Sequence, residues 1–169
     1  MIVGIDIGRK VDPTCIIKMS DTWEVNEFHM LPLQLEYHEI NNYIRDHVND
    51  VDVMYIDQTG IGDAIVGDLR QTTHDSQVNG VILTGGEKMR GLDSTWYVSK
   101  TKLLDMLARA MRENLKIKLP QDEAICLKEQ LTAMIHHKNG SIGARLGMHD
   151  DAVIALALCV FGKLVESGQ

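Results

Sequence analysis

Apolar residues recur along the chain with two spacings, and each spacing predicts one type of element. Short runs rich in β-branched residues predict strands, and apolar residues three and four positions apart predict helices. The predicted strands cover residues 2–7, 14–19, 23–30, 51–56 and 78–83. The predicted helices cover residues 36–48, 60–69, 99–114, 122–131 and 150–165. Three strands come first, and helices and strands then alternate, which predicts an α/β fold with a mixed sheet of about five strands, covered on both faces.

Two segments depart from this regular pattern. Residues 85–94 contain three glycines and predict a loop. Residues 133–145 contain two short apolar runs around Asn139-Gly140, a pair that suits a type I′ turn, so they predict a β-hairpin. No repeat, linker or low-complexity tract divides the sequence, so residues 1–169 predict a single domain.

The composition adds little to this picture. Hydrophobic residues make up 44% of the chain and charged residues 24%, as in ordinary globular proteins. The longest apolar run, residues 152–161, is too short to cross a bilayer, and the first residues lack the basic segment of a signal peptide. The three cysteines, Cys15, Cys126 and Cys159, form no CxxC pair, which predicts reduced thiols in a cytosolic protein and no zinc site.

Two aspartates stand in hydrophobic strands. Asp6 lies within Ile-Val-Gly-Ile-Asp-Ile, which places it in mid-strand, and Asp57 ends the run Val-Met-Tyr-Ile-Asp. A buried carboxylate without a partner costs on the order of several kcal/mol. Taken alone, Asp6 could cap a loop amide, and Asp57 could belong to a polar turn in which Thr59 caps the next helix. Two such acids in adjacent strands favour a shared ligand near the carboxyl ends of the strands.

A third acidic point precedes the last predicted helix, where His149, Asp150 and Asp151 come before a long apolar run. The helix dipole favours acids in a first turn, which is the simplest explanation of this pair. However, the helix is apolar on nearly all sides, so it must be buried against the sheet and bring these acids to the strand ends. Three acidic points at one place repel one another unless cations lie between them. Carboxylate ligands favour Mg²⁺ or Mn²⁺, and two such ions about 3.5–4 Å apart suit phosphodiester hydrolysis.

The net charge of −7 argues against nucleic-acid binding, which normally requires a basic surface. Carboxylates that bind metal are neutralised by it, however, so the formal charge overstates the repulsion. The basic residues also cluster in predicted loops and at helix starts: Arg9 with Lys10, Lys88 with Arg90, Lys100 with Lys102, and Lys138 with Arg145. We therefore expect weak affinity for DNA from this chain alone.

Several stretches, taken in order, resemble the nuclease domain of the large terminase subunit of tailed bacteriophages. They are Gly4-Ile5-Asp6-Ile7-Gly8 with Asp12-Pro13-Thr14, then Ile56-Asp57-Gln58-Thr59-Gly60-Ile61-Gly62-Asp63, then Ser99-Lys100-Thr101-Lys102, and finally His149-Asp150-Asp151-Ala152. Each is weak alone, but their order and spacing are fairly specific, and the resemblance covers essentially the whole chain. It implies a ribonuclease-H-like fold and metal-dependent, largely sequence-independent cutting of double-stranded DNA during genome packaging.

The resemblance also implies roles for individual residues. Asp6 and Asp57 bind two Mg²⁺ or Mn²⁺ ions, and the last acidic ligand is Asp150 or Asp151. His149 orients a water or touches a phosphate, with a solvent-facing histidine as the alternative. The hairpin at 133–145 controls the entry of DNA. The residues predicted to contact DNA are Arg9, Lys100, Lys102, Lys138 and Arg145, although a solvated surface is the alternative for each.

A whole large terminase also carries an ATPase motor, and this chain has no GxxxxGK[ST] phosphate loop. The resemblance thus implies an excised C-terminal nuclease domain with Met1 as an added start residue, which cuts DNA without ATP and does not translocate it. The implied partners are double-stranded DNA and, in the full-length protein, the ATPase domain, the small terminase subunit and the portal. The implied location is the cytoplasm of the infected bacterial host, away from any membrane.

Three alternatives compete with this interpretation. A Holliday-junction resolvase of the same superfamily suits the length, but those enzymes typically have Glu where this chain has Asp57. A fragment of an actin-like sugar kinase or ATPase also has Asp-Ile-Gly after its first strand, but it requires a second lobe and a Gly-rich phosphate loop. A non-enzymatic interaction domain leaves the convergence of acids unexplained.

Overall fold

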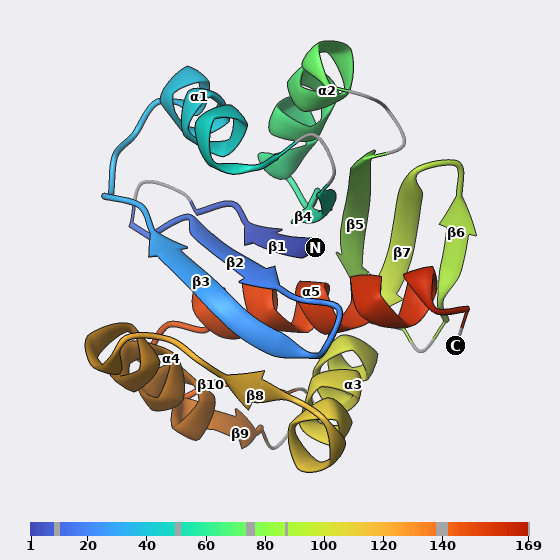
Figure 1. Ribbon diagram of the computed structural model, residues 1–169. Helices are drawn as coiled ribbons and strands as arrows, with labels where there is room; N and C mark the ends of the chain where they lie inside the picture. The colour runs from blue at the N-terminus through green and yellow to red at the C-terminus, as the bar shows by residue number, and fades with distance from the viewer. Residues whose placement is uncertain (9–10, 50–51, 74–76, 87, 138–141, 169) are drawn as a thin grey trace.

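The computed structural model describes residues 1–8, 11–49, 52–73, 77–86, 88–137 and 142–168 (Figure 1). The strands are β1 (Ile2–Asp6), β2 (Cys15–Met19), β3 (Glu24–Met30), β4 (Val53–Asp57), β5 (Val78–Thr84), β6 (Arg90–Leu92), β7 (Thr95–Ser99), β8 (Lys116–Ile117), β9 (Met134–His136) and β10 (Ile142–Ala144). The helices are α1 (Tyr37–His47), α2 (Gly62–Thr72), α3 (Lys100–Glu113), α4 (Gln121–Ala133) and α5 (Asp151–Glu166). All five predicted helices and all five predicted strands are present.

Within the described parts of the chain, eight strands form one sheet in the order β6-β7-β5-β4-β1-β2-β3-β8. β1, β2 and β3 are antiparallel, whereas β4 lies parallel to β1, β5 parallel to β4, and β7 parallel to β5. Helices α1 and α2 cover one face, and α3, α4 and α5 cover the other (Figure 1). The predicted mixed sheet with helices on both faces is therefore confirmed.

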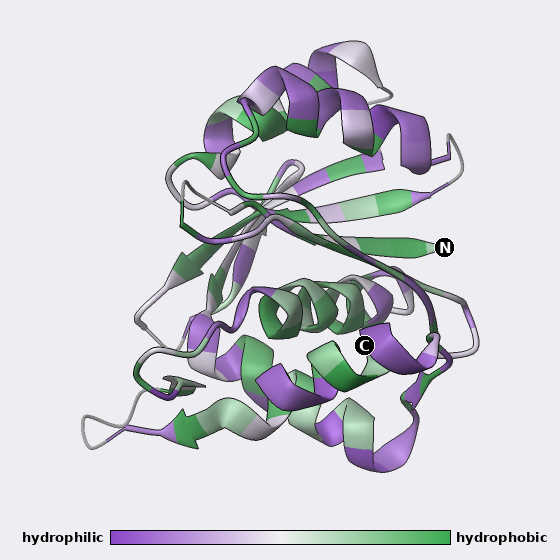
Figure 2. Ribbon diagram, turned by 90° about the vertical axis from the view of Figure 1, so that its left-hand side faces the viewer, coloured by the Kyte–Doolittle hydropathy of each residue, from purple (hydrophilic) through white to green (hydrophobic). Residues whose placement is uncertain are grey.

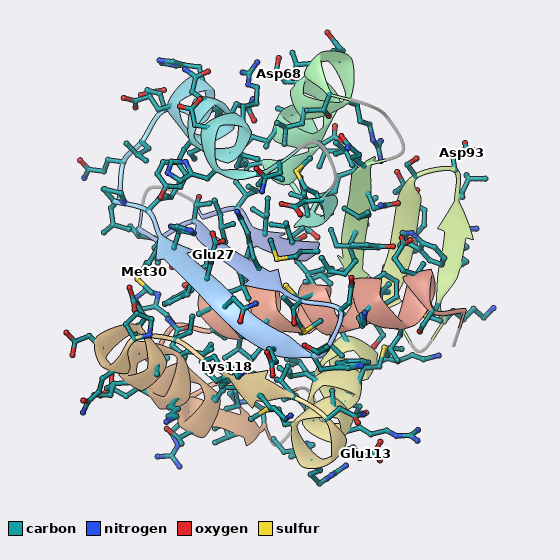
Figure 3. All side chains as sticks on the ribbon, in the orientation of Figure 1. Glu27, Met30, Asp68, Asp93, Glu113 and Lys118 are labelled. Carbon is teal, nitrogen blue, oxygen red and sulfur yellow. The ribbon has the colours of Figure 1, made fainter. Side chains whose placement is uncertain are left out.

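The expected number of strands was too low, and the prediction of a loop at 85–94 is wrong in part. Arg90–Leu92 forms β6, which pairs antiparallel with β7 through a turn at Asp93. Asp93 has φ 52, a left-handed conformation that Asp tolerates in tight turns (Figure 3). All three residues of β6 are exposed. A strand without a buried face has no alternation of hydrophobic and polar residues, so the sequence gives no signal for it.

Helix α5 is buried along most of its length and lies directly on β1. A Cβ atom at Gly4 would lie 2.0 Å from the carbonyl oxygen of Ala155, so only glycine allows this approach. Farther along α5, Gly162 packs against Ile2, so the helix runs antiparallel to β1. Figure 2 shows α5 as a largely hydrophobic ribbon between the strands and the other two helices of this face. The N-terminus of α5 is thereby held near the carboxyl end of β1.

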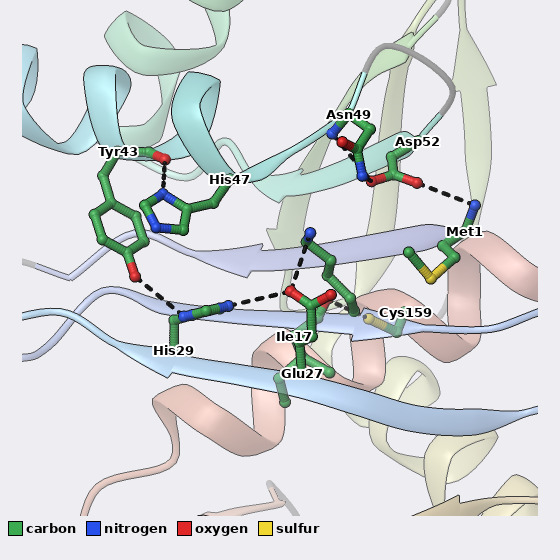
Figure 4. A network of polar contacts seen from close by, with 10 residues as sticks. Met1, Ile17, Glu27, His29, Tyr43, His47, Asn49, Asp52 and Cys159 are labelled. Atoms are coloured by element: carbon green, nitrogen blue, oxygen red, sulfur yellow. Dashed lines mark hydrogen bonds and ion pairs between the residues drawn. The ribbon is translucent and has the colours of Figure 1, made fainter. Parts of the chain in front are cut away.

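The opposite face combines an apolar core with a polar network. Lys18 is 3% exposed, and its Nζ lies 3.0 Å from Oε2 of Glu27 on the neighbouring strand (Figure 4). Nε2 of His29 lies 3.4 Å from the same carboxylate oxygen, and Nδ1 of His29 is hydrogen-bonded to the hydroxyl of Tyr43 at 3.0 Å. Because these contacts link β2 and β3 to α1, they fix the helix over this side of the sheet.

The small sheet confirms the predicted hairpin: β9 and β10 pair antiparallel, with Ile142 opposite His136. The Asn139-Gly140 turn lies outside the described residues. Cys15, Cys126 and Cys159 are free thiols. In the described ranges, no helix has both the length and the apolar character needed to cross a membrane.

Candidate active site

Asp6 and Asp57 occupy neighbouring positions at the carboxyl ends of two parallel strands. β1 ends at Asp6, so the expectation that this residue lies in mid-strand is wrong. Ile5 is opposite Ile56 in the β1–β4 register, which places the next residue of each strand, Asp6 and Asp57, side by side. Both share the sheet face of Gly4 and therefore the side covered by α5, because side chains alternate along a strand.

The N-terminus of α5 adds two further carboxylates. The helix begins at Asp151, one residue after the predicted start, and Asp150 is at the N-cap position. Oδ2 of Asp150 lies 2.8 Å from Nζ of Lys100, the first residue of α3. The Asp151 side chain is 13% exposed, and its Oδ2 is buried without a hydrogen-bond partner in the described residues.

The carboxylates are close enough to change one another's pKa. Burial raises the pKa of Asp6 well above its ordinary value, and the charges of Asp57, Asp151 and Asp150 raise it further, while Lys100 opposes the shift. Burial also raises the pKa of Asp57, while hydrogen bonding by Thr59 and the charge of Lys100 oppose the shift. The pKa of Asp151 rises to about 6, first through burial and then through the charge of Asp12. Segments from opposite ends of the chain thus form one anionic cluster, which costs stability when the acids are ionised.

The alternative explanation of Asp57, a residue of a polar turn in which Thr59 caps the next helix, is correct in part. Its Oδ1 accepts a hydrogen bond from the backbone N–H of Thr59 at 2.8 Å. Thr59 does not cap α2, because that helix begins at Gly62 and the Thr59 hydroxyl instead accepts the backbone N–H of Leu83 at 3.0 Å. The turn therefore satisfies one oxygen of Asp57 and orients the carboxylate, and it does not neutralise the charge.

A second grouping around Asp151 includes a residue to which the sequence gave no role. Nδ1 of His149 lies 3.4 Å from Oδ1 of Asp12 and 3.4 Å from Oδ2 of Asp151. One ligand atom from each of these three residues lies within 4.8 Å of the others, which suits a shared cation. Asp12 could have been found in the sequence, because it lies in the turn that directly follows the strand ending at Asp6.

The basic residues predicted to contact DNA lie in different places in the structure. Lys100 belongs to the acidic cluster through its contact with Asp150. Lys102 and Arg145 are exposed, and the backbone N–H of Lys102 donates to the hydroxyl of Ser99, which caps α3. Arg9 and Lys138 lie outside the described residues. Contact of any of these side chains with DNA stays a prediction.

The donor set fits hard divalent cations. It consists of carboxylate oxygens and one imidazole without thiolates, and Mg²⁺ and Mn²⁺ prefer oxygen ligands. The buried Oδ2 of Asp151 supports this, because it makes no hydrogen bond in the described residues, has only Nδ1 of His149 at 3.4 Å as a neighbour of opposite character, and a buried charge is normally paired or bound to a metal. Lys100 supplies one positive charge, which leaves most of the negative charge of the cluster uncompensated.

No protein-family model matches the sequence, and no curated protein matches it either. Solved structures do match over nearly the whole chain. The large terminase nuclease of thermophilic phage G20c with bound magnesium has a TM-score of 0.66 at 18% identity, over 94% of this chain and 79% of that one. The manganese-bound nuclease domain of the large terminase g2p of bacteriophage SPP1 has a TM-score of 0.58 at 12% identity, over 95% and 84%.

A mutant nuclease domain of the large terminase subunit gp2 of bacterial virus Sf6, with manganese and β-thujaplicinol, gives a TM-score of 0.58 at 13% identity. That match covers 94% of this chain and 86% of the Sf6 domain. At identities of 12–18%, these structural matches show the fold. The chain has the ribonuclease-H-like fold of the nuclease domains of phage large terminase subunits.

Proposed function

We propose that this chain is the nuclease domain of a phage large terminase and cuts double-stranded DNA with two Mg²⁺ or Mn²⁺ ions. The observation that carries the proposal is the convergence of Asp6, Asp57 and Asp151 on one partly buried place at the end of the sheet. Magnesium and manganese in the solved nucleases of the same fold support the same class of cofactor for this one.

The positions of the acids suggest a division of roles. Asp6 is adjacent to Asp57 and interacts with Asp151, so its carboxylate is placed to serve two ion positions. Asp151 is the better candidate for the last ligand, because Asp150 is already paired with Lys100. Bound there, the ions would supply charge neutralisation and an activated water for in-line attack on phosphorus. His149 lies 3.4 Å from Asp151 and 3.4 Å from Asp12, so His149 and Asp12 are placed to hold a water beside Asp151.

The wider setting follows from the same proposal. In a packaging motor, this domain would act with an ATPase domain, a small terminase subunit and a portal in the cytoplasm of the infected host. Its substrate would be the double-stranded genome, cut with little regard to sequence. Binding would rest on phosphate contacts near the acids, because the formal charge of −7 gives no general attraction for DNA.

Digestion of supercoiled plasmid tests the proposal. We expect nicked and linear products with Mn²⁺ or Mg²⁺, none with EDTA, and no requirement for ATP. A synthetic four-way junction is digested alongside a linear duplex of the same length. Preferential and symmetric cutting of the junction would favour the resolvase alternative, whereas intact plasmid under every metal condition would contradict nuclease function.

A further inference from the structure

The β6–β7 hairpin lies outside the acidic cluster and presents a cation that the cluster does not use. Arg90 opens β6, the outermost strand at one edge of the sheet, and its side chain is exposed. Tyr97 is directly opposite on β7, and the guanidinium carbon of Arg90 lies 4.6 Å from the centroid of its ring. Stacking on an aromatic ring restricts the arginine while its N–H groups remain available to an acceptor in the guanidinium plane.

The hairpin is held in place from both faces of the sheet. On the α5 side, the ring of Trp96 packs edge to face against Phe161, with centroids 5.5 Å apart. On the α2 side, the guanidinium of Arg70 donates hydrogen bonds to the carbonyl oxygen of Ser94 and to the hydroxyl of Thr95. Arg90 therefore projects from a fixed support, which lowers the entropy lost when it binds a ligand.

The same hairpin leads directly to the acidic cluster. β7 ends at Ser99 and continues into α3, whose first residue is Lys100. With standard strand spacings, the Cα atoms of Arg90 and Lys100 are at most about 16 Å apart. A cavity of 480 Å³ between the hairpin and α2 has Tyr97 on one wall and Gln58, the residue after Asp57, on another. Because side chains alternate along a strand, Tyr97 and this cavity lie on the α2 face of the sheet, whereas the acids lie on the α5 face. Arg90 and the acids share the carboxyl edge of the parallel strands, so a ligand reaches both by lying across that edge.

We propose that Arg90, supported by Tyr97, binds a backbone phosphate of the same duplex DNA whose reacting phosphate is held at the acidic cluster. The planar fork of a guanidinium matches the oxygens of a phosphate, and the exposed Lys88 adds a second cation just before β6. This inference rests on the proposed function, because it takes DNA at the acids as its starting point.

Fluorescence anisotropy with a labelled duplex of about three helical turns tests it in Ca²⁺, which takes carboxylate ligands and neutralises the acids, and a gel checks that the duplex stays intact. Arg90→Ala should weaken binding by roughly 3- to 10-fold and reduce the slope of log K against log salt by about 0.9, as expected for one lost phosphate contact. Arg112→Ala removes an equal charge from the exposed far end of α3 and should change neither quantity. Tyr97→Phe keeps the ring and should bind like the wild type, whereas Tyr97→Leu should lose part of the affinity.

Equal effects of Arg90→Ala and Arg112→Ala would overturn the inference, as would a wild-type chain that does not bind the duplex. Both variants should have the wild-type melting temperature, since both side chains are exposed. The proposed function is judged separately by metal-dependent plasmid cutting. DNA binding that depends on Arg90 without any cutting would contradict the nuclease proposal and support the DNA contact. Cutting and DNA binding that do not depend on Arg90 would support the nuclease proposal and contradict the contact.

Discussion

Asp6→Asn should reduce metal-dependent cleavage of plasmid by about a thousandfold or more without unfolding the protein. Asp6 lies beside Asp57 in the β1–β4 register, and the charges of Asp57, Asp151 and Asp150 all raise its pKa, so it would be a central ligand of the ions. Loss of that ligand removes several kcal/mol of transition-state stabilisation, and each 1.4 kcal/mol is about tenfold in rate. The initial rate of nicking in Mn²⁺, measured over a range of enzyme concentrations, checks this expectation.

The matched control is Asp46→Asn, which makes the same chemical change on an exposed position of α1. It should cleave at the wild-type rate. Asp57→Asn and Asp151→Asn should behave like Asp6→Asn, whereas Asp150→Asn should retain more activity because Asp150 is paired with Lys100. Full activity of a folded Asp6→Asn variant would show that the nuclease chemistry takes place elsewhere.

Gly4→Ala should destabilise the protein by about 3 kcal/mol or more, although it adds one methyl group. The new Cβ would lie 2.0 Å from the carbonyl oxygen of Ala155 and 2.8 Å from the backbone nitrogen of Cys159. Neither atom can rotate away, so α5 must move off β1 and lose packing in the main core. At roughly 2–4 °C per kcal/mol for a chain of this size, the melting temperature should fall by about 10 °C.

Gly67→Ala is the matched control for this substitution. Gly67 lies within α2, and an added Cβ there meets no atom within 4 Å. Alanine is the better helix former, so this variant should gain about 0.5–1 kcal/mol. Thermal unfolding of both variants, followed by circular dichroism, compares the same change in two environments. A Gly4→Ala melting temperature within 2 °C of the wild type would correspond to a loss of only about half a kcal/mol of stability. That result would contradict the close contact of α5 with β1.

The elements that carry the acids could be predicted because their patterns are local and strong. The run from Ile2 to Asp6 has the composition of a buried strand, and the last helix is apolar on nearly every side. A helix of that kind can be buried only against the sheet, which brings its two acids near the strand ends. The convergence of Asp6 with Asp151 therefore follows from burial, with no need for a detailed topology.

What the sequence did not reveal depends on contacts between distant segments. Asp12 lies near Asp151 and His149 only in the folded chain, and no periodicity specifies a contact between segments so far apart in the sequence. The pairing of Lys100 with Asp150 depends on how β7 passes into α3, and β7 itself was not predicted. β6 is a short exposed edge strand that exists because β7 offers it a backbone partner, so its residues carry no hydrophobic signal.

Divalent cations should relieve the repulsion among the acids, and thermal unfolding with and without Mn²⁺ measures this relief directly. Since the folded-state pKa of Asp6 is raised, its ionised form costs stability at neutral pH, and Asp6→Asn should melt above the wild type in EDTA. Saturating Mn²⁺ at 100 times its Kd should stabilise the wild type by about 2.7 kcal/mol, a rise of roughly 5–10 °C, and should barely affect Asp6→Asn. A wild-type melting temperature that Mn²⁺ does not change, or an equal rise in Asp6→Asn, would contradict a metal site built on these aspartates.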